Sequence, residues 1–153
     1  MLEVQREAVV DAAPADVWRL VDDLARLPEW FTFAERVELL EGEGLGRRQR
    51  IYGLWGKKQS EIDQLVTAHE PERLLEWRHE AERLNGKPAP RFAAETRFSI
   101  RLEPDGTGTR VVLHSHQDAA GPLRGLVLRT LGRRQIRDHL ERSLDRLTEA
   151  TRG

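Results

Sequence analysis

Residues 91–103 read RFAAETRFSIRLE, and apolar and polar side chains alternate along them. Successive side chains of a β-strand point to opposite faces of a sheet, so this pattern predicts a strand with one face in the core and one in water. Such half-buried strands are typical of antiparallel sheets. Thr96 and Phe98 belong to the more apolar set, which we expect to face inward.

Turn signals on both sides of this stretch predict an antiparallel meander over residues 34–117. They lie at residues 42–46, 53–56, 70–72, 85–88 and 104–108. The first of them, GEGLG, is similar to a phosphate-binding loop, but no lysine follows and Glu41 and Glu43 would repel a phosphate. We therefore interpret it as a hairpin that needs glycine at positive φ.

Helices are predicted before and after the meander. Residues 2–11 form a strand in this interpretation, and Pro14 begins a helix over residues 14–24, with a second short helix or turn near residues 29–33. Residues 121–152 carry a leucine-rich stripe at helical spacing, and Gly132 is the position where we expect a kink. A helix of that extent would be about 45 Å long, enough to cross a curved sheet.

The composition limits the possible classes of protein. The chain has 153 residues, so we expect a single domain over residues 1–153. It has no cysteine, which excludes disulfides, iron–sulfur clusters and cysteine nucleophiles. Lys+Arg 25 against Asp+Glu 26 leaves a net charge of −1, so we expect no nucleic-acid partner. With no signal peptide or transmembrane segment in this sequence, we expect a cytoplasmic location.

Several stretches resemble one protein family. They are APADVWRLVDDL at residues 13–24 with LPEW at 27–30, EPERLLEWR at 70–78, and residues 98–111 with their Gly-Thr-Arg turn. With the order of elements, they make the chain similar to the polyketide cyclase/dehydrase group of the START-related, Bet v 1-like superfamily over nearly its whole length. The resemblance implies an α+β helix-grip fold, in which a seven-stranded curved antiparallel sheet wraps around a long C-terminal helix and two short helices follow the first strand.

The resemblance also implies a hydrophobic cavity between sheet and helix, and side-chain parity predicts which residues line it. The low aromatic content of 6% favours a hollow that stays open, and we expect no carboxylate inside it. For the strand at residues 47–55 the pattern leaves the orientation open. Either Gln49, Ile51 and Gly53 face inward, or Arg50, Tyr52 and Leu54 do. The predicted ligand-binding residues are Trp30, Phe33, Gln49, Ile51, Gln64, Trp77, His79, Thr96, Phe98, Ser115, Gln117, Leu123 and Val127.

His79 is the one candidate for a catalytic role. An imidazole on the cavity side suits general-base chemistry or a hydrogen bond to a ligand, and the alternative is a partly exposed histidine near a strand end. His114 and His116 have the spacing of two metal ligands on one strand, but their parity is outward and we find no third ligand in the sequence. We therefore expect no metal site and no cofactor.

Two functions remain open at this point. The first is binding of a small hydrophobic molecule such as a polyketide, lipid or isoprenoid, with cyclisation or dehydration as the chemistry if the protein is an enzyme. The alternative is a non-enzymatic interaction protein, similar to a quinone chaperone or a ribosome-binding or partner-binding protein, that acts through its basic C-terminal helix. Arg129, Arg133 and Arg137 are spaced four residues apart, which predicts that they share one face of that helix. The other interpretation is a solvated helix face on which Arg134 pairs with Asp138 and Arg137 with Glu141. Monomer and homodimer are both compatible with the sequence.

Overall fold

A computed structural model describes residues 2–55, 57–89, 93–119, 121–123 and 132–152. The chain begins with β1 (Leu2–Val10), α1 (Pro14–Val21), the 3-10 turn η1 (Leu24–Arg26) and α2 (Leu27–Trp30). The strands that follow are β2 (Arg36–Glu41), β3 (Arg48–Trp55), β4 (Lys58–Glu70), β5 (Leu74–Leu84), β6 (Lys87–Pro88), β7 (Ala93–Asp105) and β8 (Gly108–Ala119). The last helix is α4 (Arg133–Arg152).

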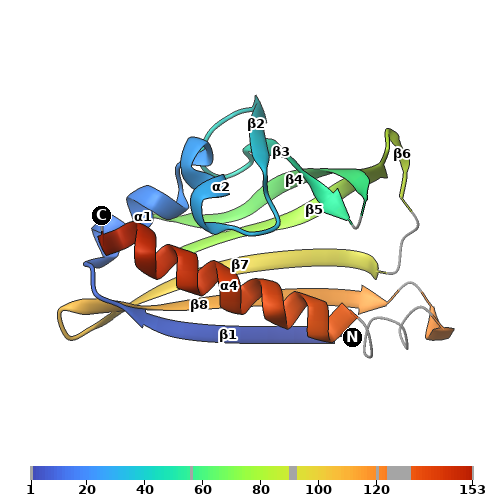
Figure 1. Cartoon of the computed structure of the whole chain (residues 1–153). Coiled ribbons are helices and arrows are strands. Elements are labelled where there is room, and N and C mark those ends of the chain that lie inside the picture. The colour runs from blue at the N-terminus through green and yellow to red at the C-terminus, as the bar shows by residue number, and fades with distance from the viewer. Residues whose placement is uncertain (1, 56, 90–92, 120, 124–131, 153) are drawn as a thin grey trace.

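The strands form one antiparallel sheet with the order β1-β8-β7-β5-β4-β3-β2, and the short β6 pairs with β5. The sheet bends, and α4 lies across its inner face with α1 and α2 near one end (Figure 1). The predicted α+β helix-grip architecture is thus confirmed, with β6 as a small addition to the seven expected strands. Within the described part of the chain, no helix is both long and apolar enough to cross a bilayer.

The core fills the space between the sheet and the helices. Leu140, Leu144 and Leu147 of α4 are buried, as the helical stripe predicts. On β7 the predicted alternation is confirmed where side chains are described, since Phe98, Ile100 and Leu102 are buried. Burial of these apolar surfaces removes them from water, which is the main free-energy gain of folding.

Glycines allow two features of the backbone near β3. Gly42, Gly44 and Gly46 adopt φ of 73°, 63° and 84°, which confirms the predicted hairpin. At Gly53 a Cβ atom would lie 2.6 Å from the carbonyl oxygen of Phe33, so glycine lets β3 pass directly beneath the connection between α2 and β2.

The structure also decides the orientation of β3 and describes part of the predicted last helix. Gln49 and Ile51 are buried on the inner face, so the opposite parity of β3 faces outward. The helix predicted over residues 121–152 is described from Arg133 onward as α4. Residues 124–131 lie outside the described residues, so the kink at Gly132 beside them stays a prediction.

Candidate functional site

A cavity of about 70 Å³ lies between the inner face of the sheet and α4. Space of this size holds about two water molecules, since each takes up roughly 30 Å³ in the liquid. Its lining comes from the α2–β2 connection, five strands and α4. The lining residues are Phe31, Phe33, Ile51, Ile62, Gln64, Trp77, His79, Thr96, Phe98, Ser115, Gln117 and Ile136.

Four aromatic rings occupy much of the space beside this cavity. Phe31 contacts Phe33, Trp77 and Phe98, with ring centroids 5.1, 5.6 and 5.1 Å away. Trp77 and Phe98 lie 5.2 Å apart. The hollow expected from the low aromatic content is present but small, because several of the few aromatic residues are concentrated at this one place. The hollow is therefore smaller than the roughly 300–1,000 Å³ of ordinary ligand pockets.

Most of the predicted cavity residues lie where parity placed them. Nine of the thirteen line the cavity: Phe33, Ile51, Gln64, Trp77, His79, Thr96, Phe98, Ser115 and Gln117. Their placement does not test whether they bind a ligand, which stays a prediction.

Of the other four predicted residues, three do not line the cavity and one lies outside the described residues. Trp30 and Gln49 are both 0% exposed and buried beside it, where Trp30 packs on Phe31. Leu123 is 75% exposed and does not line the described cavity, and its predicted role in ligand binding stays a prediction. Val127 lies outside the described residues.

Three lining residues were missing from the predicted set, although each carried a signal. Ile62 shares the inward parity of Gln64 on β4, and Ile136 belongs to the apolar stripe of the last helix. Phe31 lies in the aromatic stretch after Pro28 and has no strand parity to place it.

Two lining residues carry buried polar atoms that lack a partner. The indole nitrogen of Trp77 and the amide oxygen of Gln117 have no hydrogen bond to any described residue. An unpaired polar group inside a protein costs roughly 1–3 kcal/mol. A ligand that offered an acceptor to Trp77 or a donor to Gln117 would recover part of this cost.

His79 is paired with a carboxylate, which the sequence analysis did not expect. Its Nδ1 lies 3.0 Å from Oε1 of Glu82. Glu80 is the extra residue of a β-bulge, since Gln64 pairs with His79 and Asp63 with Ala81. The bulge reverses the alternation, so Glu82 lies on the same face as His79.

A continuous line of hydrogen bonds leads to the other nitrogen of this imidazole. Arg47 donates from Nε to Oε1 of Gln49 over 3.1 Å, and Gln49 donates from Nε2 to Oε1 of Gln64 over 2.8 Å. The Nε2 of Gln64 is then 3.4 Å from Nε2 of His79. At the far end, Nη1 of Arg47 lies 3.2 Å from Oδ1 of Asp22, and the Arg47 side chain is 8% exposed. Arg47, Gln49 and Gln64 are all buried.

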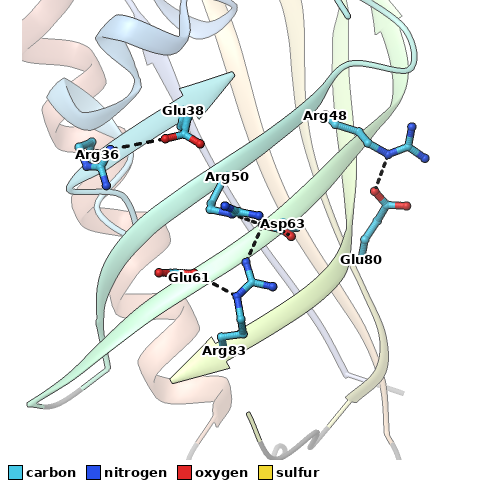
Figure 2. Close-up of polar contacts among 8 residues, drawn as sticks. All are labelled: Arg36, Glu38, Arg48, Arg50, Glu61, Asp63, Glu80 and Arg83. Carbon is cyan, nitrogen blue, oxygen red and sulfur yellow. Dashed lines mark hydrogen bonds and ion pairs between the residues drawn. The ribbon is translucent and has the colours of Figure 1, made fainter. Parts of the chain in front are cut away.

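The neighbouring arginines of β3 lie on the outer face instead. Figure 2 shows Arg48 with Glu80, and Arg50 and Arg83 converging on Asp63. The hydrogen bond from Arg50 is the main reason why the pKa of Asp63 lies below its ordinary value. Arg48 and Arg50 thus pair with carboxylates across the strands.

The remaining polar candidates are also paired on the surface. His116 lies 3.1 Å from Glu3, and His114 lies 3.8 Å from the same carboxylate, on the outward face as predicted. On α4, Glu141 pairs with Arg6 of β1, so the predicted pair with Arg137 is replaced. Arg137 lies 3.8 Å from Asp138, and Arg129 lies outside the described residues.

Comparison with known proteins decides the family. Residues 1–152 match the family described as polyketide cyclase / dehydrase and lipid transport. The chain belongs to this family. The match covers both the sheet and α4, which are the two parts that form the cavity. No curated protein sequence matches the chain significantly.

Solved structures of similar fold agree with this membership. TTHA0849 from Thermus thermophilus is 24% identical, with 98% of this chain and 97% of that chain covered and a TM-score of 0.77. Ara h 8.0201 is 14% identical over 98% and 97% of the two chains, with a TM-score of 0.71. The di-domain ARO/CYC BexL from the BE-7585A biosynthetic pathway is 21% identical, with a TM-score of 0.76; 97% of this chain covers 46% of that chain. At these identities the likeness supports the fold.

Proposed function

We propose that this member of the family binds a small hydrophobic molecule, such as a polyketide, lipid or isoprenoid, in the cavity between the sheet and α4. The observation that carries the proposal is a mostly apolar hollow, two of whose lining residues, Trp77 and Gln117, each have a buried polar atom without a partner among the described residues. An apolar site with a few polar groups is the usual composition of a small-molecule pocket. The present size of the hollow implies that the rings of Phe31 and Phe33 move when a large ligand enters.

Native mass spectrometry of the purified protein, with a thermal-shift screen of quinones, sterols, fatty acids and aromatic polyketides, tests this proposal. A ligand that binds only the folded state stabilises it by about 2.7 kcal/mol at a hundredfold its Kd. Thr96→Trp places a large ring in the cavity and is expected to abolish the shift. Leu54→Trp, at an exposed position of β3, is the matched control. The proposal is wrong if no hydrophobic compound shifts the melting temperature, or if the Thr96 variant responds like the control.

A second candidate function is cyclisation or dehydration of a bound chain, and the paired His79 and Glu82 favour it. The carboxylate stabilises an imidazole that has taken up a proton, as a general base requires. The family description supports the same chemistry. The test is the product distribution from a reactive poly-β-ketone chain, measured by mass spectrometry with wild type, His79→Gln and Glu82→Gln. Equal product ratios for all three proteins and for buffer would remove this candidate.

A further inference from the structure

The hydrogen-bonded line that ends at His79 has a fixed direction. A guanidinium has donors only and stays charged at every accessible pH. Arg47 must therefore face the oxygen of the Gln49 amide, which leaves the Gln49 nitrogen to donate to the oxygen of Gln64. The nitrogen of Gln64 then faces Nε2 of His79.

This direction determines which nitrogen of His79 carries hydrogen. Gln64 presents a donor to Nε2, so Nε2 must offer its lone pair, and Nδ1 carries the hydrogen that is donated to Glu82. The other neutral tautomer would place two donors against each other at Nε2 and two acceptors at Glu82. Turning the side-chain amides of Gln49 and Gln64 by 180° would remove the clash of donors at Nε2 of His79. It would also place the amide nitrogen of Gln49 against Arg47, and Arg47 cannot accept a hydrogen bond.

The cavity wall therefore carries one acceptor and one donor side by side. His79 and Gln64 both line the cavity, and the atoms that face each other are 3.4 Å apart, which is long for a hydrogen bond. A hydroxyl group of a ligand can accept from the Gln64 amide and donate to Nε2 of His79 at the same time. A ketone or ether can only accept, and a carboxylate has no hydrogen for His79 and would lie near the charge of Glu82.

We propose that Arg47 is a positioning residue that holds His79 as an acceptor, and that His79 and Gln64 together form a subsite for the hydroxyl group of a neutral alcohol or phenol. This inference deepens the proposed binding function and depends on it for the ligand. The state of His79 itself can be measured without any ligand.

The first experiment measures the imidazole nitrogens by ¹⁵N NMR, with His79→Gln to assign the signal. Wild type is expected to show a protonated Nδ1 and an unprotonated Nε2. Arg47→Met is expected to give a mixture of tautomers, while Arg47→Lys, which also only donates, restores the wild-type signal. Arg48→Met is the matched control, because Arg48 is the next residue along β3 and faces outward.

If Arg47→Met does not fold, Gln49→Met makes the same test, because it breaks the line while the contact between Arg47 and Asp22 stays in place. A protonated Nε2 in the wild type would overturn the proposal. So would an unchanged His79 signal in the variant that breaks the line.

The second experiment titrates phenol, toluene and benzoate, three probes of similar size, and follows the amide signals of the cavity residues. Phenol is expected to bind about tenfold more tightly than toluene in the wild type, and benzoate least tightly. In Arg47→Met and Gln64→Leu the preference for phenol is expected to fall to about twofold or less. Equal binding of phenol and toluene to the wild type would refute the hydroxyl subsite while leaving the cavity function intact. If none of the probes moves these signals, both the subsite and the cavity function are contradicted.

Discussion

His79 and Glu82 lie on one face of β5 and contact each other over 3.0 Å, although two residues separate them in the chain. In a regular strand, residues at this spacing point to opposite faces. The bulge at Glu80 brings them together, and Glu80 itself pairs outward with Arg48. One extra residue thus adds a carboxylate partner to a cavity histidine.

Replacing Glu82 by leucine tests this pairing. The change leaves the Nδ1 hydrogen of His79 without its acceptor, so we expect the free energy of unfolding to fall by about 1 kcal/mol. Urea denaturation measures the loss. Glu103→Leu, at an exposed position of β7, is the control and should change stability by less than about 0.5 kcal/mol. Equal effects of the two changes would contradict a specific contact.

Asp63 is expected to be the most important carboxylate of the outer face. It accepts hydrogen bonds from Arg50 and Arg83, and its side chain is 18% exposed. Asp63→Asn should cost about 2 kcal/mol at pH 7. The pKa of Asp63 is lower in the folded state than in the unfolded chain. Its contribution to the free energy of unfolding is therefore fully present at a pH above its ordinary pKa, and it is lost as the pH falls through the lowered pKa.

Chemical denaturation of wild type and Asp63→Asn between pH 7 and pH 2 measures both effects. The difference between the two proteins should shrink on the acid side. Glu38→Gln is the control from the same face, since Glu38 lies 3.8 Å from Arg36 and both side chains are exposed. Its expected cost is below about 0.5 kcal/mol, and a cost equal to that of Asp63→Asn would count against the network.

His139 is expected to make stability depend on pH near neutrality. Burial is the main cause that lowers its pKa from 6.5, and the charge of Arg142 adds to it. Between the ordinary and the lowered pKa, the unfolded chain binds a proton that the folded chain does not. The free energy of unfolding should therefore decrease as the pH falls through 6.5, and level off below the lowered pKa.

Melting temperatures of wild type and His139→Gln from pH 8 to pH 5 measure this dependence. The glutamine variant should lose this part of the slope, whereas His114→Gln, a change on the outer face, should keep it. The Nδ1 of His139 also lies 2.7 Å from Oγ1 of Thr32, a contact that joins the α2–β2 connection to α4. An identical slope in His139→Gln would show that other groups cause the dependence.

Gly53→Ala tests the close approach of β3 to the α2–β2 connection. The added methyl group would lie 2.6 Å from the backbone oxygen of Phe33, so the connection must shift. We expect a loss of about 1–3 kcal/mol, as for overpacking in a core. Gly121→Ala is the control, because no atom of the described residues lies within 4 Å of its added Cβ. If Gly53→Ala leaves the free energy of unfolding unchanged, the α2–β2 connection can shift without a cost in stability.

The fold could be predicted because its signals are local. Alternation on β7 and β8, glycine turns and the stripe of Leu140, Leu144 and Leu147 each depend on a few neighbouring residues. Parity then carried the prediction to most of the nine predicted residues that line the cavity. Parity fails where the register shifts, and for this reason Glu82 was missed.

The size of the cavity and the line of hydrogen bonds that leads to His79 could not be predicted in the same way. The hollow depends on how Phe31, from a segment without strand parity, packs against Trp77 and Phe98. The line from Arg47 to His79 joins β3, β4 and β5, and it exists only once their register is set. Composition gave the number of aromatic residues but not their concentration in one place.

The ring cluster of Phe31, Phe33, Trp77 and Phe98 has a consequence for how such proteins diverge. Exchanging one of these rings for a smaller side chain would enlarge the interior without altering any strand pairing. Proteins that descend from one ancestor can therefore come to bind different ligands through very few mutations, while the fold stays the same. Breadth of ligand choice across relatives is the evolutionary outcome that this arrangement favours.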